Sequence, residues 1–185
     1  NYDSVLLKKI KNEQLNSSDI NLIHNVVLTS MRYNLEIDKI IRIYTKKINK
    51  NSNSYFLISS GITQIVFLNF KDYAVIHSSV EIAKNKKLKI YPAFINGLLR
   101  NIARNKKNLS KIRVSFLMLP QWFKNQTNNW NEKLKTNFVE TIKMEPDIHL
   151  VFKNSEDLDK FKLPSIKTTK SSLVMKKTAK IENLP

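Results

Sequence analysis

The 185-residue sequence contains no cysteine and two glycines, Gly61 and Gly97. Without cysteine the chain can form no disulfide, no thiolate metal site and no cysteine nucleophile. Two glycines cannot build a P-loop or a G-x-G-x-x-G dinucleotide loop, because those loops need several positions that only glycine tolerates. We therefore predict no catalytic residue, no metal site and no cofactor in this chain. The lack of cysteine and of a secretion signal favours a cytoplasmic location.

Long apolar runs are also missing. The longest uncharged run, residues 51–70, is interrupted by serines, a threonine and a glutamine. Its apolar part is shorter than the roughly 20 residues that a membrane span needs. We predict a helix from about Ser54 to Leu68 that is buried in a bundle, and no membrane partner.

Acidic residues are few: 15 stand against 32 basic ones, for a net charge of +17. Nucleic acid is the usual partner of such a basic domain. The 27 lysines and 22 asparagines can partly reflect codons rich in A and T. That bias does not explain why residues 82–131 hold eleven basic side chains and no acidic one. The segment predicts a basic face.

The histidines and acids do not form a reactive cluster in the sequence. His24, His77 and His149 lack ligand spacing, so we interpret them as ordinary helix-face or core residues. Glu36 and Asp38 stand near an expected helix start, where acids favour the helix dipole. We assign them a capping role.

Apolar residues recur at helical spacing through the first two thirds of the chain, without the regular Gly and Pro of an all-β protein. Ser17 or Ser18 can cap the second helix, and Pro92 suits a first turn. We predict an all-α helical bundle. Its expected helices cover residues 2–15, 19–33, 35–48, 54–68, 72–87 and 92–109. The third of these is predicted to carry a core stripe of Leu35, Ile37, Ile40, Ile41 and Tyr44.

The pattern changes after residue 117. Residues 120–144 predict two helices, and residues 147–152 and 171–177 predict short strands, with a helical turn at 155–161 between them. Two strands cannot cover their own faces. We therefore predict an incomplete, small α/β subdomain over residues 118–185 that continues beyond Pro185. Trp122 and Trp130 could stack on bases, but core packing is the preferred interpretation.

The stretch "FINGLLRNIARNKKNL", residues 94–109, combines a glycine with two arginines. On a helical wheel Gly97, Arg100 and Arg104 form a stripe opposite the apolar side. A mid-helix glycine costs about 1 kcal/mol relative to alanine, so something should approach it closely. Two guanidinium groups four residues apart match phosphate. The approaching group could be a partner's backbone, or a second helix whose acids pair with the arginines.

These segments resemble a known family. "VEIAK" at residues 80–84, followed by "FINGLLRNIAR" at 94–104, is similar to the last two core helices of NusB-type RNA-binding domains. "VVLTSMRYNLEIDKII" at residues 26–41 resembles the earlier helix pair, with Arg32 at the family's usual arginine. The resemblance covers roughly residues 2–111 and implies a NusB-like RNA-binding helical domain over residues 1–117, whose first helix is missing.

The following segments resemble one branch of relatives. "LPQWFKNQTNNW" and "DIHLVFKN" look like the Pro-x-Trp helix and the strand that lead to the methyltransferase part of Sun/Fmu-type (RsmB) 16S rRNA cytosine-5 methyltransferases. "IENLP" resembles the segment ahead of the catalytic core. "HLVFKN" departs from the family's arginine-containing strand, and the core with its cysteine is absent. The resemblance implies S-adenosylmethionine for the full-length protein and a catalytically silent chain here.

We thus predict the RNA-binding region of an rRNA (cytosine-5) methyltransferase, with ribosomal RNA rather than DNA as its partner and no oligomeric state assigned. The predicted RNA-binding residues are Arg32, Lys84, Lys86, Lys87, Gly97, Arg100, Arg104, Lys106 and Lys107. A NusB-type antitermination factor is one alternative, although the residues after Leu119 argue against it. A helical protein-interaction module, in which the lysines only keep the surface solvated, is another.

Overall fold

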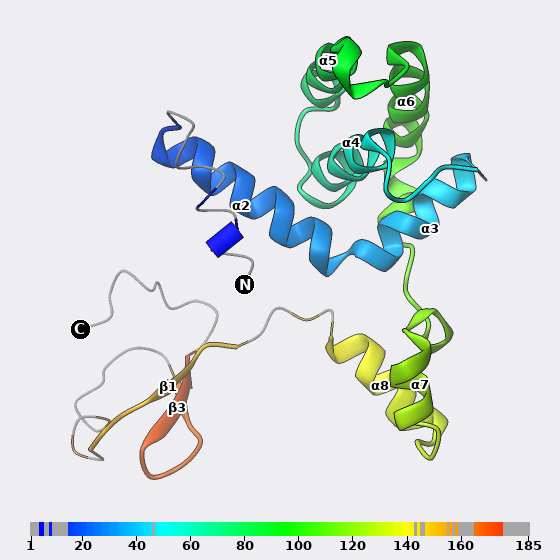
Figure 1. The fold of residues 1–185 in the computed structure, drawn as a ribbon. Coiled ribbons are helices and arrows are strands. Elements are labelled where there is room, and N and C mark those ends of the chain that lie inside the picture. Colours follow the sequence, from blue (N-terminus) through cyan, green and yellow to red (C-terminus); the bar gives the residue numbers. More distant parts are fainter. Residues whose placement is uncertain are drawn as a thin grey trace. The chain divides into compact units, whose positions relative to one another are not determined.

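The chain divides by its internal contacts into two compact units, Asn1–Val139 and Glu140–Pro185. The computed structural model describes residues 4, 5, 8, 15–45, 47–142, 144, 147–154, 156, 158 and 165–175. The first unit is helical and the second contains a small sheet (Figure 1). The predicted fold class, a helical bundle followed by strands, is confirmed.

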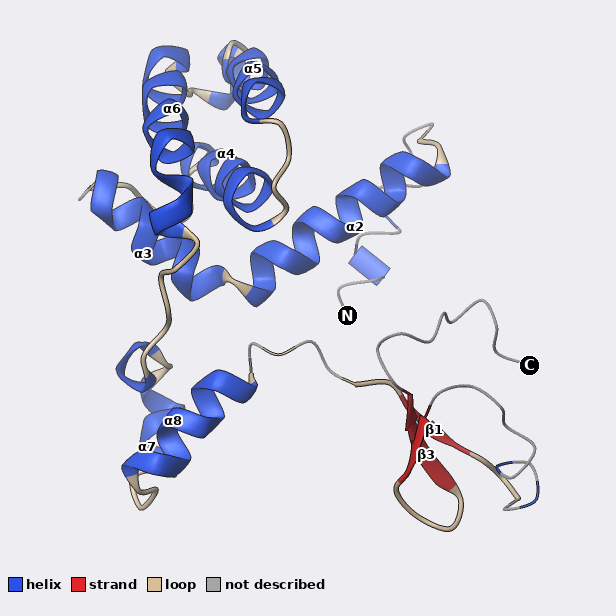
Figure 2. Cartoon of the chain, turned by 180° about the vertical axis from the view of Figure 1, so that it is seen from behind, coloured by secondary structure: helices blue, strands red, loops and turns tan. Residues whose placement is uncertain are grey.

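Helices α3 to α6 build the bundle around one core, as Figure 2 shows from behind. They span Asn34–Tyr44, Asn53–Ile62, Asp72–Ala83 and Pro92–Leu109. The side chains that are fully buried in this core are mostly isoleucines, which fill it with branched aliphatic volume. They are Ile37, Ile40, Ile41, Ile58, Ile62, Ile65, Ile95, Leu99 and Ile102, together with Thr63.

The predicted buried helix at 54–68 is confirmed. Helix α4 continues without a break into a π-helical turn, η1, at Thr63–Phe67. Thr63 is polar and fully buried, but its hydroxyl has partners: it donates to the Ser59 carbonyl at 2.8 Å and lies 2.8 Å from the Ser30 hydroxyl. A buried hydroxyl with both hydrogen bonds made costs little. The Ser30 contact also ties η1 to the preceding helix.

That preceding helix, α2, spans Ser17–Arg32 and has no buried residue. Asn16 caps it, since its side chain accepts from the Asp19 N–H at 2.8 Å. The predicted cap at Ser17 or Ser18 is therefore wrong by one residue, because asparagine competes equally well for that position. At the far end of α2, Tyr33 stacks on Phe67 with ring centroids 4.2 Å apart.

Of the predicted core stripe, helix α3 buries Ile37, Ile40 and Ile41 and half-buries Leu35 and Tyr44. The helix ends at Tyr44 rather than continuing to residue 48. Thr45 is extended, with φ −148°. Glu36 lies in the first turn of α3, as the capping interpretation expects, whereas Asp38 lies beyond that turn and does not cap the helix. Glu36 is also buried, at 3% exposed, and Asp38 joins an ion-pair cluster.

Asp38 contacts Arg42 Nε at 3.0 Å and Lys50 Nζ at 2.9 Å, and its carboxylate accepts from the Tyr55 hydroxyl at 3.4 Å. Burial raises the pKa of Asp38, but the hydrogen bonds and charges of Lys50 and Arg42 outweigh it and hold the pKa below its usual value. Burial and the nearby Asp38 charge raise the pKa of Tyr55. The cluster links α3 to α4 and to the loop between them.

We expect Asp38→Asn to lower the free energy of unfolding at pH 7 by no more than about 1 kcal/mol, because both cations are largely exposed. A carboxyl with a lowered folded pKa stabilises above its unfolded pKa, near 3.8, and loses that contribution as pH falls through the folded value. The two proteins should therefore converge in stability below pH 4. Urea unfolding across pH 3–7 measures this, and a difference that grows towards low pH would contradict it.

Helix α5 ends at Ala83, four residues before the predicted end. The chain then forms a 3-10 turn, η2, at Lys86–Leu88, in which the Asn85 side chain accepts from the Lys87 N–H at 3.1 Å. Lys89 has a φ of 52°, which turns the chain towards α6. A local asparagine hydrogen bond offers the backbone an alternative to the helix. Pro92 occupies the first turn of α6, as predicted.

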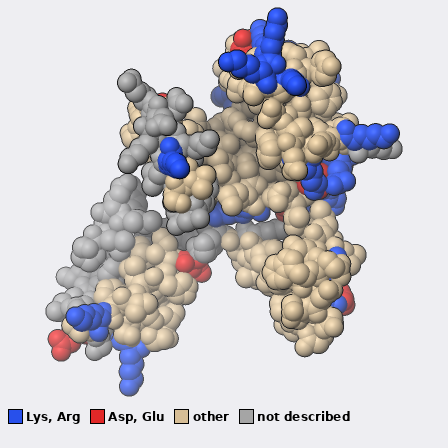
Figure 3. All heavy atoms as spheres, in the orientation of Figure 1, with Lys and Arg blue, Asp and Glu red and all other residues tan. Residues whose placement is uncertain are grey.

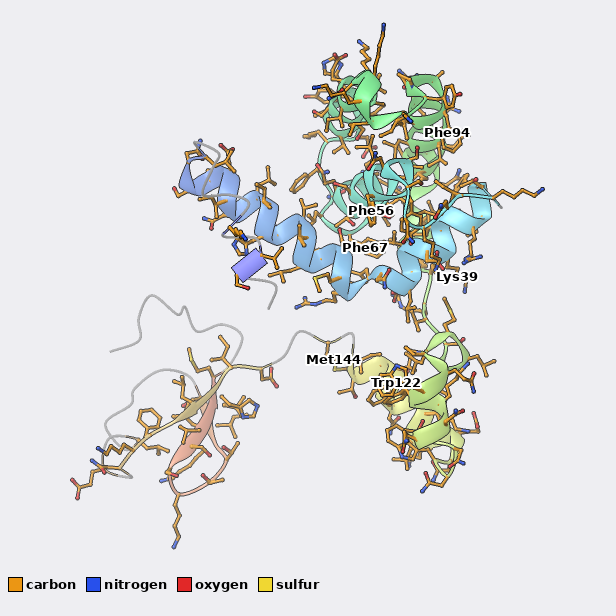
Figure 4. The ribbon with its side chains drawn as sticks, in the orientation of Figure 1. Lys39, Phe56, Phe67, Phe94, Trp122 and Met144 are labelled. Carbon is orange, nitrogen blue, oxygen red and sulfur yellow. The ribbon has the colours of Figure 1, made fainter. Side chains whose placement is uncertain are left out.

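The two predicted helices after residue 117 are confirmed as α7 at Gln121–Gln126 and α8 at Glu132–Thr141. They enclose a second apolar cluster in which Trp130 packs edge-on against Phe123 and Phe138. Core packing is confirmed for Trp130 and wrong for Trp122, which is 68% exposed on α7 (Figure 4). Neighbouring helical residues point about 100° apart, and Phe123 takes the inward position.

The second unit contains an antiparallel sheet of strand order β1-β3-β2. Strands β1 at His149–Val151 and β3 at Ser172–Met175 confirm the two predicted strands. Strand β2 at Ser165–Lys167 was not predicted, because its three residues carry a single apolar side chain. The predicted helix at 2–15, the turn at 155–161 and the terminal "IENLP" lie largely outside the described residues. The predicted domain boundary after residue 117 stays a prediction.

Candidate functional site

A groove of about 430 Å³ opens between α5 and α6, which pack side by side. Each helix contributes one wall, because residues three and four apart share a face. The α5 wall consists of Asp72, Tyr73, Ile76, His77 and Val80, and the α6 wall consists of Asn96, Arg100, Ala103 and Arg104. The predicted arginine pair therefore lines a concave surface.

Neither arginine is paired with a carboxylate among the residues that the structure describes. Arg100 Nε donates to the Asn96 side chain at 2.9 Å, and Arg104 donates from one terminal nitrogen to Asn101 at 3.4 Å. Both residues are exposed. A guanidinium carries five donors, so most of the donors of each group are available to a ligand.

The carboxylate in the groove is already neutralised. Asp72 forms an ion pair with Lys106, whose Nζ lies 3.0 Å from the carboxylate, and the same ammonium donates to the Asn69 side chain at 3.2 Å. Lys106 is thus a partly buried member of the α5–α6 packing rather than a freely extended surface lysine. By holding Asp72, it leaves the charge of the two arginines uncompensated.

Four more of the predicted lysines lie at the ends of α5 and α6 and do not line the groove. Lys84 follows α5 and pairs with Glu81 at 2.6 Å, which lowers the pKa of that carboxyl by a hydrogen bond. Lys86 and Lys87 lie exposed on η2, and Lys107 lies exposed in the last turn of α6. Figure 3 shows basic side chains gathered where α5 passes into α6. Arg32 lies on α2 and does not line the groove.

The two glycines have different roles. A Cβ at Gly97 would meet nothing within 4 Å, whereas a Cβ at Gly61 would lie 2.8 Å from a methyl group of Leu99. The close approach of two helices therefore occurs at Gly61, between α4 and α6. The alternative in which a second helix packs on Gly97 is wrong for the described part of the chain. Gly97 is exposed on the arginine-bearing side of α6.

We expect Gly97→Ala to raise the free energy of unfolding by about 0.5–1 kcal/mol, because alanine is the better helix former and its methyl has open space. For a chain of this size that corresponds to about 1–4 °C in melting temperature. Thermal unfolding followed by circular dichroism measures it. The same change at Gly61 provides the contrast, since its methyl meets Leu99. A lower melting temperature for Gly97→Ala would contradict the open surroundings.

Sequence reasoning missed the α5 wall. Tyr73, His77 and Asp72 line the groove but were not among the predicted binding residues. A signal existed, because Asp72, Ile76 and Val80 recur every four residues and mark one helical face. Nothing in that spacing indicates which neighbouring helix the face meets.

No group of histidine or acidic side chains within the described ranges has the arrangement of a metal site. Among those same residues, no helix is both long and apolar enough to cross a membrane.

Comparison with known proteins gives two relatives. The chain is 30% identical over 106 residues to "Probable ribosomal RNA small subunit methyltransferase B" of Bacillus subtilis, a match that covers 56% of this chain and 24% of that protein. It is 27% identical over 114 residues to "Transcription antitermination protein NusB" of Finegoldia magna, covering 59% of this chain and 83% of that protein. The chain thus spans about a quarter of the methyltransferase.

The family comparison locates the similarity along the chain. Residues 1–104 match the NusB family. This range includes α2 to α5 and most of α6, together with both arginines of the groove. Because the match extends over more than half of the 185 residues, the chain belongs to the NusB family.

Proposed function

We propose that this chain is the RNA-binding region of an rRNA (cytosine-5) methyltransferase. The α5–α6 surface holds ribosomal RNA through phosphate contacts, so that a catalytic core outside this chain can reach its target cytosine. The observation that carries the proposal is the groove between α5 and α6, where Arg100 and Arg104 project without a carboxylate partner among the described residues. Guanidinium groups without a carboxylate partner can donate charge-assisted hydrogen bonds to phosphate oxygens.

RNA as the ligand is supported by charge and by family. The segment from residue 82 to 131 has no acid to repel a phosphate backbone, and it supplies the turn η2, all of α6 and its exposed lysines. Membership of the NusB family points to the same class of ligand. Phosphate contacts position a nucleic acid without reading its sequence, so the choice of target would rest on RNA shape and on the catalytic part.

The methyltransferase setting rests on two supports. One is the 30% identity to the B. subtilis protein over 106 residues. The other is the presence of α7, α8 and the sheet after the family match ends at residue 104, since these elements agree with the resemblance to Sun/Fmu-type enzymes. S-adenosylmethionine and the catalytic cysteine would belong to the part of the protein that this chain does not contain.

An antitermination factor is the second candidate. It is favoured by the match to the F. magna protein, which covers 83% of that protein's length. The helices and sheet that extend from residue 121 to 175 favour the methyltransferase instead. A coding sequence that continues past Pro185 into a glycine-rich cofactor loop and a Pro-Cys motif would decide for the methyltransferase, and a stop codon would decide against it.

RNA binding itself is tested by titrating the purified chain against fragments of small-subunit ribosomal RNA at several salt concentrations. If phosphates are the main contacts, log K should fall linearly with log salt, by about 0.7 for each phosphate contacted on a single strand. A net charge of +17 can also cause unspecific attraction. Polyglutamate, an acidic polymer without phosphate, is therefore the matched competitor. If polyglutamate displaces the bound RNA as readily as competing RNA does, the chain is only a basic protein-interaction module.

A further inference from the structure

We propose that the groove between α5 and α6 holds one unpaired ribonucleotide, with Tyr73 stacking on its base and Arg100 and Arg104 holding its phosphates. The inference rests on the proposed RNA-binding function and specifies the form of RNA that this surface takes. It assigns a ligand to residues of α5 that no charge argument selects.

Tyr73 provides the stacking surface. Its side chain lines the groove and is 76% exposed, so its ring is not used in the packing of the bundle. Unpaired bases stack on such aromatic rings, and each stacked base contributes about 1–3 kcal/mol in single-strand binders. An exposed tyrosine elsewhere on a surface needs no explanation, but this one shares a concave site with two arginines.

The inside of the groove suits a base and its rim suits a phosphate. Ile76, Val80 and Ala103 are half-buried and form an apolar floor of the groove, whereas the two arginines are exposed. Its volume of about 430 Å³ falls in the range of about 300–1,000 Å³ that small ligands occupy. This combination fits a flat ring joined to an anionic group.

Charge favours the same ligand. The ion pair at 3.0 Å between Lys106 and Asp72 neutralises the carboxylate of the groove. Arg100 and Arg104 therefore give the groove a net positive charge. In a duplex the bases are stacked and paired, and they cannot enter a groove of this size without opening the helix. The site should therefore discriminate single strands from duplexes, which a purely electrostatic surface does not do.

The test compares Tyr73→Leu with Tyr91→Leu in the intact chain. Tyr91 is a matched control because it is also a tyrosine, 80% exposed, and does not line the groove. The probes are one labelled oligoribonucleotide, single-stranded, and the same strand in a duplex, with affinities from fluorescence polarisation. Tyr73→Leu should weaken single-strand binding about 5- to 150-fold, which is the stacking free energy converted at about 1.4 kcal/mol per tenfold. Duplex binding should not change, and Tyr73→Phe should retain affinity.

A second measurement locates the base directly. A single strand that carries 5-iodouridine should crosslink to the peptide containing Tyr73 on irradiation, and Tyr73→Leu should abolish that crosslink. If RNA binding persists while Tyr73→Leu behaves like Tyr91→Leu, or the crosslink maps to another peptide, the nucleotide site is overturned and the proposed RNA-binding function stands. If the unaltered chain shows no salt-dependent RNA binding, both are overturned.

Discussion

Replacing Arg100 and Arg104 together by glutamate should weaken RNA binding by about 100-fold at low salt. Hydrogen bonds to charged groups contribute about 1.5–3 kcal/mol each, and two of them at the lower value amount to roughly a hundredfold in affinity. Glutamate also repels the phosphate. The salt dependence should become shallower by about 1.4 units, since two single-strand phosphate contacts are lost.

The fold should survive this change. Both side chains are exposed, and among the residues that the structure describes their hydrogen bonds go to asparagines on the same helix. Circular dichroism and the melting temperature check this before any binding is measured.

The matched control is Lys39→Glu combined with Lys133→Glu. These exposed lysines lie on α3 and α8, outside the groove, and the pair changes the net charge by the same amount (Figure 4 labels Lys39). If the control loses as much affinity as the arginine variant, total charge rather than the α5–α6 surface holds the RNA, and the proposed interface is wrong.

The second large effect is expected where α4 crosses α6. Leu99 is fully buried, and its methyl groups stand 2.8 and 3.0 Å from the position of a Cβ on Gly61. Leu99→Ala should lower the free energy of unfolding by about 2–5 kcal/mol, because it removes buried methyl groups and leaves a cavity. This packing holds α6, and with it the arginine pair, against the core of the bundle.

Gly61→Ala should have opposite effects in the two backgrounds. In the natural sequence the new methyl overpacks the core at a cost of about 1–3 kcal/mol, and we expect this cost to exceed the gain of about 1 kcal/mol in helix propensity because the Cβ would lie 2.8 Å from Leu99. In the Leu99→Ala background the clashing atoms are gone, so the gain remains and the cavity is partly filled. The double-mutant cycle should therefore show a coupling of about 1–3 kcal/mol.

Urea unfolding, with midpoints compared at a constant slope, measures the four proteins of this cycle. Gly97→Ala is the internal control: apart from its own helix backbone, no described residue would lie within 4 Å of the new Cβ, and the change should add independently to Leu99→Ala. Strict additivity between Gly61→Ala and Leu99→Ala would show that the two helices are not in close contact at Gly61.

Helical periodicity is a local property, and it was sufficient for most of the bundle. Ile37, Ile40 and Ile41 were predicted on one core stripe and are buried, and the uncharged segment around Ile58 is the central helix. Helix ends were harder to place, because neighbouring residues compete for the same role. Asn16 rather than Ser17 caps α2, and Asn85 draws the chain into a turn that ends α5 early.

The roles of the two glycines could not be separated from the sequence. Gly61 and Gly97 both lie within helices, and each weakens its helix by the same amount. Only the packing of α4 on α6 shows that Gly61 permits a close contact while Gly97 faces open space. Among the groups predicted to approach Gly97 closely, a bound ligand is therefore the remaining candidate.

By itself the sequence determined the elements of the bundle, the basic character of residues 82–131 and the stripe of α6 that carries Arg100 and Arg104, because composition and periodicity act within a few turns of chain. Tertiary structure alone decided that α5 supplies the opposite wall and that Lys106 neutralises Asp72, 34 residues away. Contacts between distant segments depend on how helices pack, and no spacing along the chain encodes that packing.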